Sequence, residues 1–309
     1  MDILLIVDVY GWAWWHKACA IKKYLPYDFK IVLGDYRLTN TNEFDSIHFF
    51  DWLGASNRKN VTTSVCSHNH ELIDYEMIRY KKELPEFSAI TCVSKKLYDN
   101  AKRENWNKQV YLCANGVDEE KFYPNKKSHS DKFVVGWVGQ KTSGGLLKSP
   151  VDIKGFEHVL NPIIEKLKEY DNIELIIHSN NYKSATPHDE MIDLYNKFDL
   201  LISTSFLEGT PGPIFEASAC GIPVISTNVG CAPELITNEV NGYLIDFYKN
   251  KDEALDRVDQ FVDKIVYLKN NRDLCKIMGE NNRKEIEKAW TWKERSKQWI
   301  PVFENHRTK

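Results

Sequence analysis

Two glutamates, Glu208 and Glu216, are separated by seven residues in the glycine- and proline-rich segment EGTPGPIFE. A helix is expected to begin at Pro213, since proline suits the first helical position, where its missing N–H has no intrahelical partner. Ile214 and Phe215 would then present free amides, and such amides together with the helix dipole favour a phosphate. The segment therefore combines two carboxylates with a helix end that can bind a phosphate.

The elements around this segment are predicted to be a strand, a loop, a helix and a second strand. The apolar run LLIST at residues 200–204 is the first strand, and Gly221 ends the short helix. Pro223 and the run VIST at 224–227 begin the next buried strand. In parallel units of this kind ligands bind at the carboxyl ends of the strands, so Glu208, in the loop after the first strand, is placed at the site.

Short apolar runs alternate with helical patterns along the chain, which predicts an α/β protein with parallel, doubly wound sheets. At 309 residues the chain exceeds the size at which one core usually stops growing, so two such domains are expected. The boundaries are drawn at 1–122 for the N-terminal domain, 123–132 for a polar linker and 133–284 for the C-terminal domain, with a tail at 285–309. Helices are expected at about 13–24, 156–170, about 188–198, about 251–270 and 285–300.

Composition and charge are those of an ordinary globular protein. Charged residues make up 28% and hydrophobic residues 42% of the chain, and the net charge of -3 gives no global attraction to nucleic acid or anionic lipid. No stretch reaches the roughly 18 to 20 apolar residues of a membrane span, and the first apolar run lacks the basic leader of a signal peptide. Seven cysteines without a C-x-x-C pair fit reduced thiols. A cytoplasmic protein is expected, with peripheral contact at the inner membrane face left open.

The segment that begins at Glu208 resembles the donor-domain signature of family 4 glycosyltransferases, which includes the E-x7-E motif. The match continues through EASACGIPVIST, Gly230, Glu234 and NGYLID, and the segments TCVSKKLYDN, NGVDEEKFYP and KFDLLISTS match the family as well. The resemblance covers residues from about 60 to about 250. It implies a GT-B fold, in which two Rossmann-like domains face a central cleft, and a tail at 285–309 that crosses back to the N-terminal domain.

The activity implied by this resemblance is that of a hexosyl- or pentosyltransferase. It would move a sugar from a nucleoside-diphosphate sugar, UDP- or GDP-linked, to an acceptor hydroxyl. Family 4 enzymes retain the anomeric configuration and use neither a metal nor a cofactor. Glu208 would contact hydroxyls of the donor sugar, and Glu216 would hold the ribose of the nucleotide. The residues implied to approach the sugar and the phosphates are Gly212, Pro213, Ile214 and Phe215.

The cations for the diphosphate depart from the family pattern. Family members place an arginine after the first strand of the second domain and a lysine before a glycine a few positions later. Here Gln140 and Lys141 follow that strand, and the pair Lys154 and Gly155 comes after an inserted segment. Lys154 is therefore assigned to the leaving phosphate, and Lys141 is the candidate replacement for the missing arginine. Surface lysines without a role in binding are the alternative for both.

Two further positions complete the predicted donor site. His68 follows a strand at a place where the family commonly carries a histidine facing the donor sugar, although a hydrogen-bonded core histidine fits the same position. Cys66 and His70 alternate with it, but this group lacks a fourth zinc ligand, so no metal is expected. Gly11, after the first strand, would let the backbone approach the phosphates.

Three tryptophans crowd the turn after the first strand, where the family receives its acceptor: Trp12, Trp14 and Trp15. Their rings are assigned to the acceptor. Packing inside the domain is the alternative for at least one of them, because adjacent residues on a helix point about 100° apart. The acceptor is left open among a glycan, a lipid-linked sugar, a small molecule and modified DNA.

Two alternatives to this assignment stay open. The missing arginine suits a degenerate nucleotide-sugar-binding module that has lost turnover. A DNA-base glycosyltransferase acting on a hydroxymethylated pyrimidine shares the fold, and the net charge of -3 argues against it.

Overall fold

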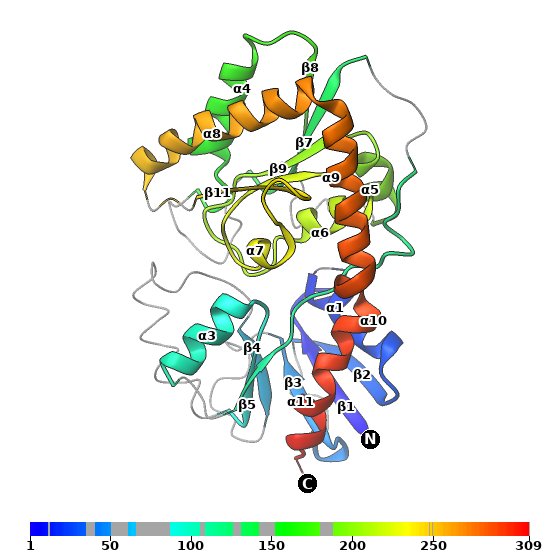
Figure 1. Cartoon of the computed structure of the whole chain (residues 1–309). Helices are drawn as coiled ribbons and strands as arrows, with labels where there is room; N and C mark the ends of the chain where they lie inside the picture. Colours follow the sequence, from blue (N-terminus) through cyan, green and yellow to red (C-terminus); the bar gives the residue numbers. More distant parts are fainter. Residues whose placement is uncertain are drawn as a thin grey trace. The chain divides into compact units, whose positions relative to one another are not determined.

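The computed structural model divides the chain into two compact units (Figure 1). The first comprises Met1–Gly116 with Trp290–Lys309, and the second comprises Val117–Ala289. The described residues are 1–11, 13–34, 41–50, 61–65, 87–105, 109–125, 131–141, 152–179, 188–246, 248 and 250–308.

The chain passes from one unit to the other after residues 116 and 289, whereas boundaries were expected after residues 122 and 284. Residues 117–122 belong to the second unit because Phe122 is buried there, with its ring 5.9 Å from that of Tyr195. Arg283 holds the same segment, since its Nη1 donates to the carbonyl oxygens of Glu119 and Phe122.

The first unit is built on a sheet of six parallel strands in the order β2-β1-β3-β4-β5-β6. Such strands are runs of apolar residues because both faces of a parallel sheet are buried. Leu4 and Ile6 of β1 join the core on one face, and Leu5 and Val7 join the core on the other. The strands are β1 (Asp2–Val7), β2 (Asp28–Leu33), β3 (Ser46–Phe49), β4 (Thr62–Val65), β5 (Ala89–Cys92) and β6 (Val110–Leu112).

Helices cover both faces of this sheet. Ala18 and Ile21 of α1 (Ala13–Tyr24) share a core with Trp299 and Phe303 of the C-terminal segment. On the other face, α3 (Lys95–Arg103) is capped by the Ser94 hydroxyl, which accepts the Leu97 N–H, and the Leu97 side chain enters the second core. A short 3-10 turn at Thr41–Glu43 precedes β3.

A buried polar group lies among these apolar residues. The ring nitrogens of His48, on β3, are 2.8 Å from the hydroxyl oxygen of Thr62 and 2.9 Å from that of Ser64. The ring of Trp299 meets the His48 ring edge-on at 4.7 Å. Burial, and then the charge of Lys17, lower the pKa of His48 well below its ordinary value, so this histidine is neutral in the folded unit.

The C-terminal segment is a series of short helices and not the single helix expected over 285–300. A π-helical turn at Ile286–Trp290 is followed by Thr291, whose backbone is extended, with φ −72° and ψ 152°. The Thr291 hydroxyl accepts the Glu294 N–H and so caps a new helix. The elements after this cap are α10 (Trp292–Arg295), a 3-10 turn (Ser296–Trp299) and α11 (Ile300–Asn305).

The second unit has a sheet of five parallel strands in the order β11-β10-β9-β7-β8. Its core includes Val135 and Trp137 of β7 together with Phe261 and Ile265 of α8 (Lys251–Asn270). The strands are β7 (Phe133–Gly139), β8 (Ile173–Ser179), β9 (Leu200–Ser203), β10 (Val224–Thr227) and β11 (Gly242–Ile245).

The longest helix of this unit, α8, begins after Asn250, whose side chain accepts the Glu253 N–H. A further helix that the sequence analysis did not anticipate, α9, follows it directly. The helices are α4 (Asn161–Leu167), preceded by a π-helical turn at Phe156–Leu160, α5 (His188–Tyr195), α6 (Gly212–Ala219), α7 (Ala232–Leu235), α8 (Lys251–Asn270) and α9 (Arg272–Glu285).

In the described part of the chain, no helix is both long and apolar enough to span a membrane. None of the described cysteines, which exclude Cys66, forms a disulfide with another described residue.

Candidate functional site

The strand order of the second sheet reverses between β7 and β9, because β8 and β9 flank β7 on opposite sides. In open parallel sheets ligands bind at such a point, outside the carboxyl ends of the two strands. Gln140 and Lys141 leave the end of β7, and residues 204–208 leave the end of β9. The topology therefore places the candidate site at the loop that carries Glu208.

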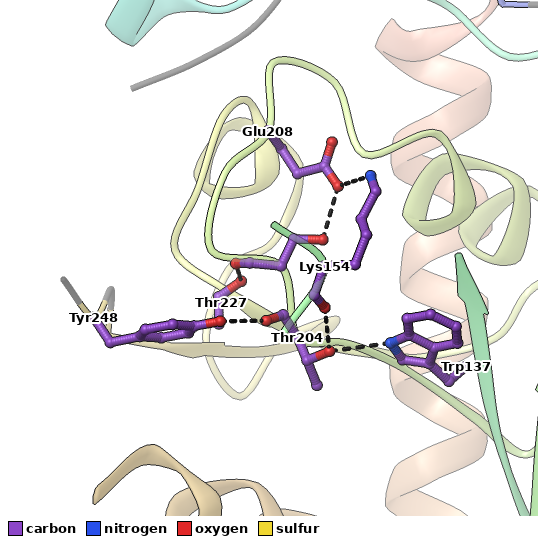
Figure 2. A network of polar contacts seen from close by, with 7 residues as sticks. Trp137, Lys154, Thr204, Glu208, Thr227 and Tyr248 are labelled. Atoms are coloured by element: carbon purple, nitrogen blue, oxygen red, sulfur yellow. Dashed lines mark hydrogen bonds and ion pairs between the residues drawn. The ribbon is translucent and has the colours of Figure 1, made fainter. Parts of the chain in front are cut away.

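An ion pair joins two of the predicted site residues at this edge. Lys154 Nζ lies 2.5 Å from Glu208 Oε1, although the two residues are 54 positions apart (Figure 2). The Ser205 hydroxyl donates to the same carboxylate oxygen at 2.7 Å. The side chain of Lys154 is 31% exposed and that of Glu208 is 11% exposed, so screening by water is incomplete. A carboxylate and an ammonium group thus converge where the sequence predicted the donor sugar and its phosphate.

The main chain of Lys154 is held by Thr204 (Figure 2). The Thr204 hydroxyl donates to the Lys154 carbonyl oxygen at 2.7 Å and accepts from Trp137 Nε1 at 3.0 Å. Tyr248 donates its hydroxyl to the Thr204 carbonyl oxygen at 2.9 Å. Burial raises the pKa of Tyr248 far above its ordinary value, so its phenol stays a donor. These hydrogen bonds connect β7 and the loop after β9 to the turn that carries Lys154.

The turn itself requires glycine. Gly155 has φ +64°, and a Cβ built on it would lie 2.1 Å from the Thr204 carbonyl oxygen and 2.7 Å from the Tyr248 hydroxyl. After the turn, the Asp152 carboxylate accepts the N–H groups of Phe156, Glu157 and His158 at 2.7–2.9 Å. Since an orphan amide at a helix start needs an acceptor, Asp152 fixes the start of the π-helical turn at Phe156–Leu160. Lys154 is therefore held on both sides by fixed backbone.

The helix with the expected phosphate-binding end begins at Gly212, one residue earlier than predicted. The Ile214 N–H consequently donates to the Pro211 carbonyl oxygen at 3.1 Å, so the expectation of a free amide at Ile214 was wrong. The side chains of Ile214 and Phe215 are buried in the unit. A Cβ at Gly212 would meet no atom within 4 Å, so the first turn of α6 is open at this position.

Glu216 lies one turn further along α6 and is oriented by a buried tyrosine. The Tyr195 hydroxyl donates to Glu216 Oε2 at 2.6 Å. Burial, and then the charge of Glu216, raise the pKa of Tyr195 well above its ordinary value, which keeps the phenol protonated. The same causes raise the pKa of the Cys220 thiol to about 12. Glu216 is therefore a fixed carboxylate acceptor on the helix that follows the Glu208 loop.

The replacement cation proposed for the missing arginine has its own contacts. The Lys141 amide donates to the Ser179 hydroxyl at 3.3 Å, and its ammonium group lies 5.2 Å from the centre of the Phe156 ring. Gln140 is half-buried beside it at the end of β7. Phe156 belongs to the turn that follows Lys154, so the side chain of Lys141 lies against the segment that carries Lys154.

In the first unit, Gly11 has φ +75°, a left-handed conformation that suits glycine, and its carbonyl oxygen lies 2.9 Å from His16 Nε2. Trp14 and Trp15 are half-buried and pack against the core of this unit. The Trp15 ring also lies 4.5 Å from that of Tyr10, which is 68% exposed. The roles predicted for Gly11 and the tryptophans stay predictions.

The predictions for His68 and Trp12 concern positions outside the described residues, as do those for Cys66 and His70. Among the described residues, no group of three or more His, Cys, Asp or Glu side chains is gathered to hold a metal ion.

The sequence analysis missed the residues that support the ionisable groups: Ser205, Thr204, Tyr248 and Tyr195. Ser205 had a weak signal, because a serine three residues before Glu208 in the same loop can reach its carboxylate. Tyr195 and Tyr248 had none, since their partners are distant in the sequence.

The match to a protein family lies within the second unit. Residues 162–285 match the family model of glycosyl transferases group 1. An uncharacterised glycosyltransferase of Methanocaldococcus jannaschii is 32% identical over 218 residues, which are 69% of this chain and 58% of that protein. The chain spans about half of the length of the curated relatives that it matches.

Two solved structures share the fold over nearly the whole chain. Sucrose-phosphate synthase from Thermosynechococcus elongatus has a TM-score of 0.71 at 14% identity, with 98% of each chain covered. HepE from Anabaena, in complex with UDP-glucose, has a TM-score of 0.68 at 14% identity and covers 99% of this chain and 100% of that chain. The predicted α/β fold with two Rossmann-like domains of the GT-B type is thereby confirmed. Residues 162–285, which carry Glu208 and Glu216, are thus the part of the chain that matches glycosyl transferases group 1.

Proposed function

We propose that the chain transfers a sugar from a nucleoside-diphosphate sugar to an acceptor hydroxyl, with retention of the anomeric configuration and without a metal or cofactor. The observation that carries the proposal is the convergence of Lys154, Glu208 and Ser205 at the carboxyl ends of β7 and β9. This is the edge of the sheet at which parallel α/β folds bind nucleotides. The glycosyl transferases group 1 match covers the strand and loop that carry Glu208.

The reaction explains why these groups are needed. As the bond between the anomeric carbon and the phosphate oxygen breaks, negative charge grows on the diphosphate and positive charge grows on the sugar ring. A positioned cation at the diphosphate, Lys154, lowers the barrier because it stabilises charge that develops in the transition state. Glu208 accepts hydrogen bonds from hydroxyls of the sugar. The acceptor oxygen attacks from the face that the phosphate leaves, and the departing phosphate oxygen takes its proton.

Glu216 is proposed to hold the ribose. A carboxylate close to a diphosphate would repel it, whereas the two ribose hydroxyls are neutral donors that suit a carboxylate acceptor. Tyr195 already donates to one oxygen of Glu216 and so fixes the direction in which the carboxylate points. In this proposal Glu208 contacts the sugar that is transferred, whereas Glu216 contacts the ribose, which does not react.

The donor is proposed to be a UDP- or GDP-linked sugar, with UDP-glucose the first to be tested because HepE was solved with it. The acceptor class is proposed to be a glycan, a lipid-linked sugar or a small molecule. The proposed location is the cytoplasm.

A thermal-shift screen tests the proposal. UDP, GDP and their common sugar conjugates are added to the purified chain, and a ligand that binds the folded state raises its melting temperature. A conjugate that raises it is then supplied in labelled form, and release of labelled sugar to water or acceptor is followed with and without a chelator. Glu216→Gln is expected to raise KM with little effect on kcat, the pattern of lost uniform binding. No shift with any nucleotide would refute the proposal, and binding without turnover would point to a binding module.

A further inference from the structure

Glu208 and Lys154 carry opposite charges and are each other's close partner, yet the proposed reaction assigns them to different parts of the donor. Lys154 Nζ is 2.5 Å from Glu208 Oε1, and the Ser205 hydroxyl donates to the same oxygen. The ammonium group that is proposed to bind the leaving diphosphate is therefore already bound to a carboxylate. A phosphate that reaches Lys154 has to share or displace this interaction with Glu208.

The surroundings make this competition strong. Glu208 is 11% exposed and Lys154 is 31% exposed, so water screens their charges only in part. The backbone on both sides of Lys154 is fixed by Thr204 and by Gly155, so only a rotation of the Lys154 side chain can move the ammonium group away. Two anions that share one ammonium group repel each other, and the repulsion weakens the binding of the second anion.

The intact donor and the product differ in what they offer to Glu208. A nucleoside-diphosphate sugar brings sugar hydroxyls, which donate hydrogen bonds to the carboxylate and compensate it for the loss of Lys154. A nucleoside diphosphate has no sugar to offer, so the carboxylate keeps its attraction for Lys154.

We infer that Glu208 is an internal counter-ion that competes with the product diphosphate for Lys154 and thereby promotes product release. The inference rests on the proposed function and adds a second role to Glu208. The intact donor opens the ion pair, transfer removes the sugar, and the pair closes again as the nucleoside diphosphate leaves.

The test is the affinity of UDP and GDP for the Glu208→Gln variant, measured by titration calorimetry. Glutamine keeps the shape of the side chain and an acceptor oxygen for Ser205, but it removes the negative charge. We expect the dissociation constant of the nucleoside diphosphate to fall about fivefold or more, the lower end of usual coupling between sites, while kcat also falls because the sugar loses its carboxylate. Glu174 is exposed on β8, so Glu174→Gln removes the same charge away from Lys154 and should leave the affinity unchanged.

A double-mutant cycle separates the ion pair from a general charge effect. In a Lys154→Gln background, Glu208→Gln should give no gain in affinity, because no ammonium group remains to be released. An equal gain in both backgrounds, or an unchanged or weaker affinity in Glu208→Gln alone, would overturn the inference while leaving the proposed function intact. If neither the wild type nor Glu208→Gln binds UDP or GDP, the proposed function fails and the inference fails with it.

Discussion

Replacing Gly155 with alanine tests how rigidly the turn that carries Lys154 is held. A Cβ at Gly155 would lie 2.1 Å from the Thr204 carbonyl oxygen and 2.7 Å from the Tyr248 hydroxyl. The left-handed backbone, with φ +64°, costs a residue with a Cβ about 1–2 kcal/mol. Forcing a methyl group into packed surroundings costs about 1–3 kcal/mol more. We therefore expect Gly155→Ala to lower the free energy of unfolding of the second unit by about 2–5 kcal/mol.

Two other glycines of the same unit separate these contributions. Gly221 has φ +72°, but its Cβ would lie 3.2 Å from Pro124 Cγ and 3.8 Å from the Gly279 carbonyl oxygen, without a severe clash, so Gly221→Ala should cost mainly the backbone part, about 1–2 kcal/mol. Gly212 has room for a Cβ and no left-handed backbone, so Gly212→Ala should leave the free energy of unfolding nearly unchanged. The expected order of stability is therefore Gly212→Ala, then Gly221→Ala, then Gly155→Ala.

Hydrogen exchange followed by mass spectrometry in increasing urea measures these values, because peptides from β9 and β10 report the opening of the second unit by itself. Gly155→Ala is also expected to slow sugar transfer, because the turn must shift to make room for the methyl group and would move Lys154 with it. If Gly155→Ala lowers the free energy of unfolding no more than Gly221→Ala does, Thr204 and Tyr248 can shift at little cost. They would then not hold Lys154 rigidly, contrary to our inference.

Three further predictions concern the polar groups around the two sheets. The folded unit disfavours the protonated form of His48, so its contribution to stability is complete above the unfolded pKa of about 6.5 and is lost as the pH falls below that value toward the lower folded pKa; urea unfolding of His48→Gln should lack this part of the pH dependence. Tyr195→Phe removes the donor to Glu216 and should raise the KM for the nucleotide sugar a few-fold at a stability cost of about 1 kcal/mol; an unchanged KM would show that Tyr195 does not position Glu216. Thr204→Val removes two hydrogen bonds and should lower both kcat and the melting temperature, whereas Thr204→Ser should restore both; equal loss in the two variants would mean that the hydroxyl is unimportant.

Some helices were predictable from the sequence and others were not. The expected helices at 13–24 and 251–270 coincide with α1 and α8, the second of which begins after a capping asparagine. The helix α9 was missed because its buried stripe, Cys275, Met278, Gly279 and Asn282, includes a glycine and a polar asparagine and so has few large apolar side chains. The break at Thr291 was visible as a threonine three residues before a glutamate, a known helix start that the run of tryptophans obscured.

The sequence could name candidate residues for the site but not their arrangement. The spacing of Glu208 and Glu216 and the motif at Lys154 led to a prediction of shared site membership, and the structure brings Lys154 and Glu208 into contact. Their contacts depend on segments far apart in the chain and on side-chain rotamers, neither of which a motif encodes. The wrong expectation at Ile214 had a local cause, because α6 starts at Gly212 and a shift of one residue moves that amide into the helix.

The division of the chain into units has a consequence for its synthesis. The second unit is one continuous stretch, residues 117–289, whereas the first is completed only by residues 290–309. Trp299, Val302 and Phe303 fill the core against α1, so the N-terminal sheet leaves the ribosome before the side chains that cover it exist. Because domains generally fold as units, the second unit is expected to fold first although it is made later. Until residues 290–309 are made, the apolar side chains that pack against them stay exposed in the nascent N-terminal segment. A chaperone would bind the chain during this interval.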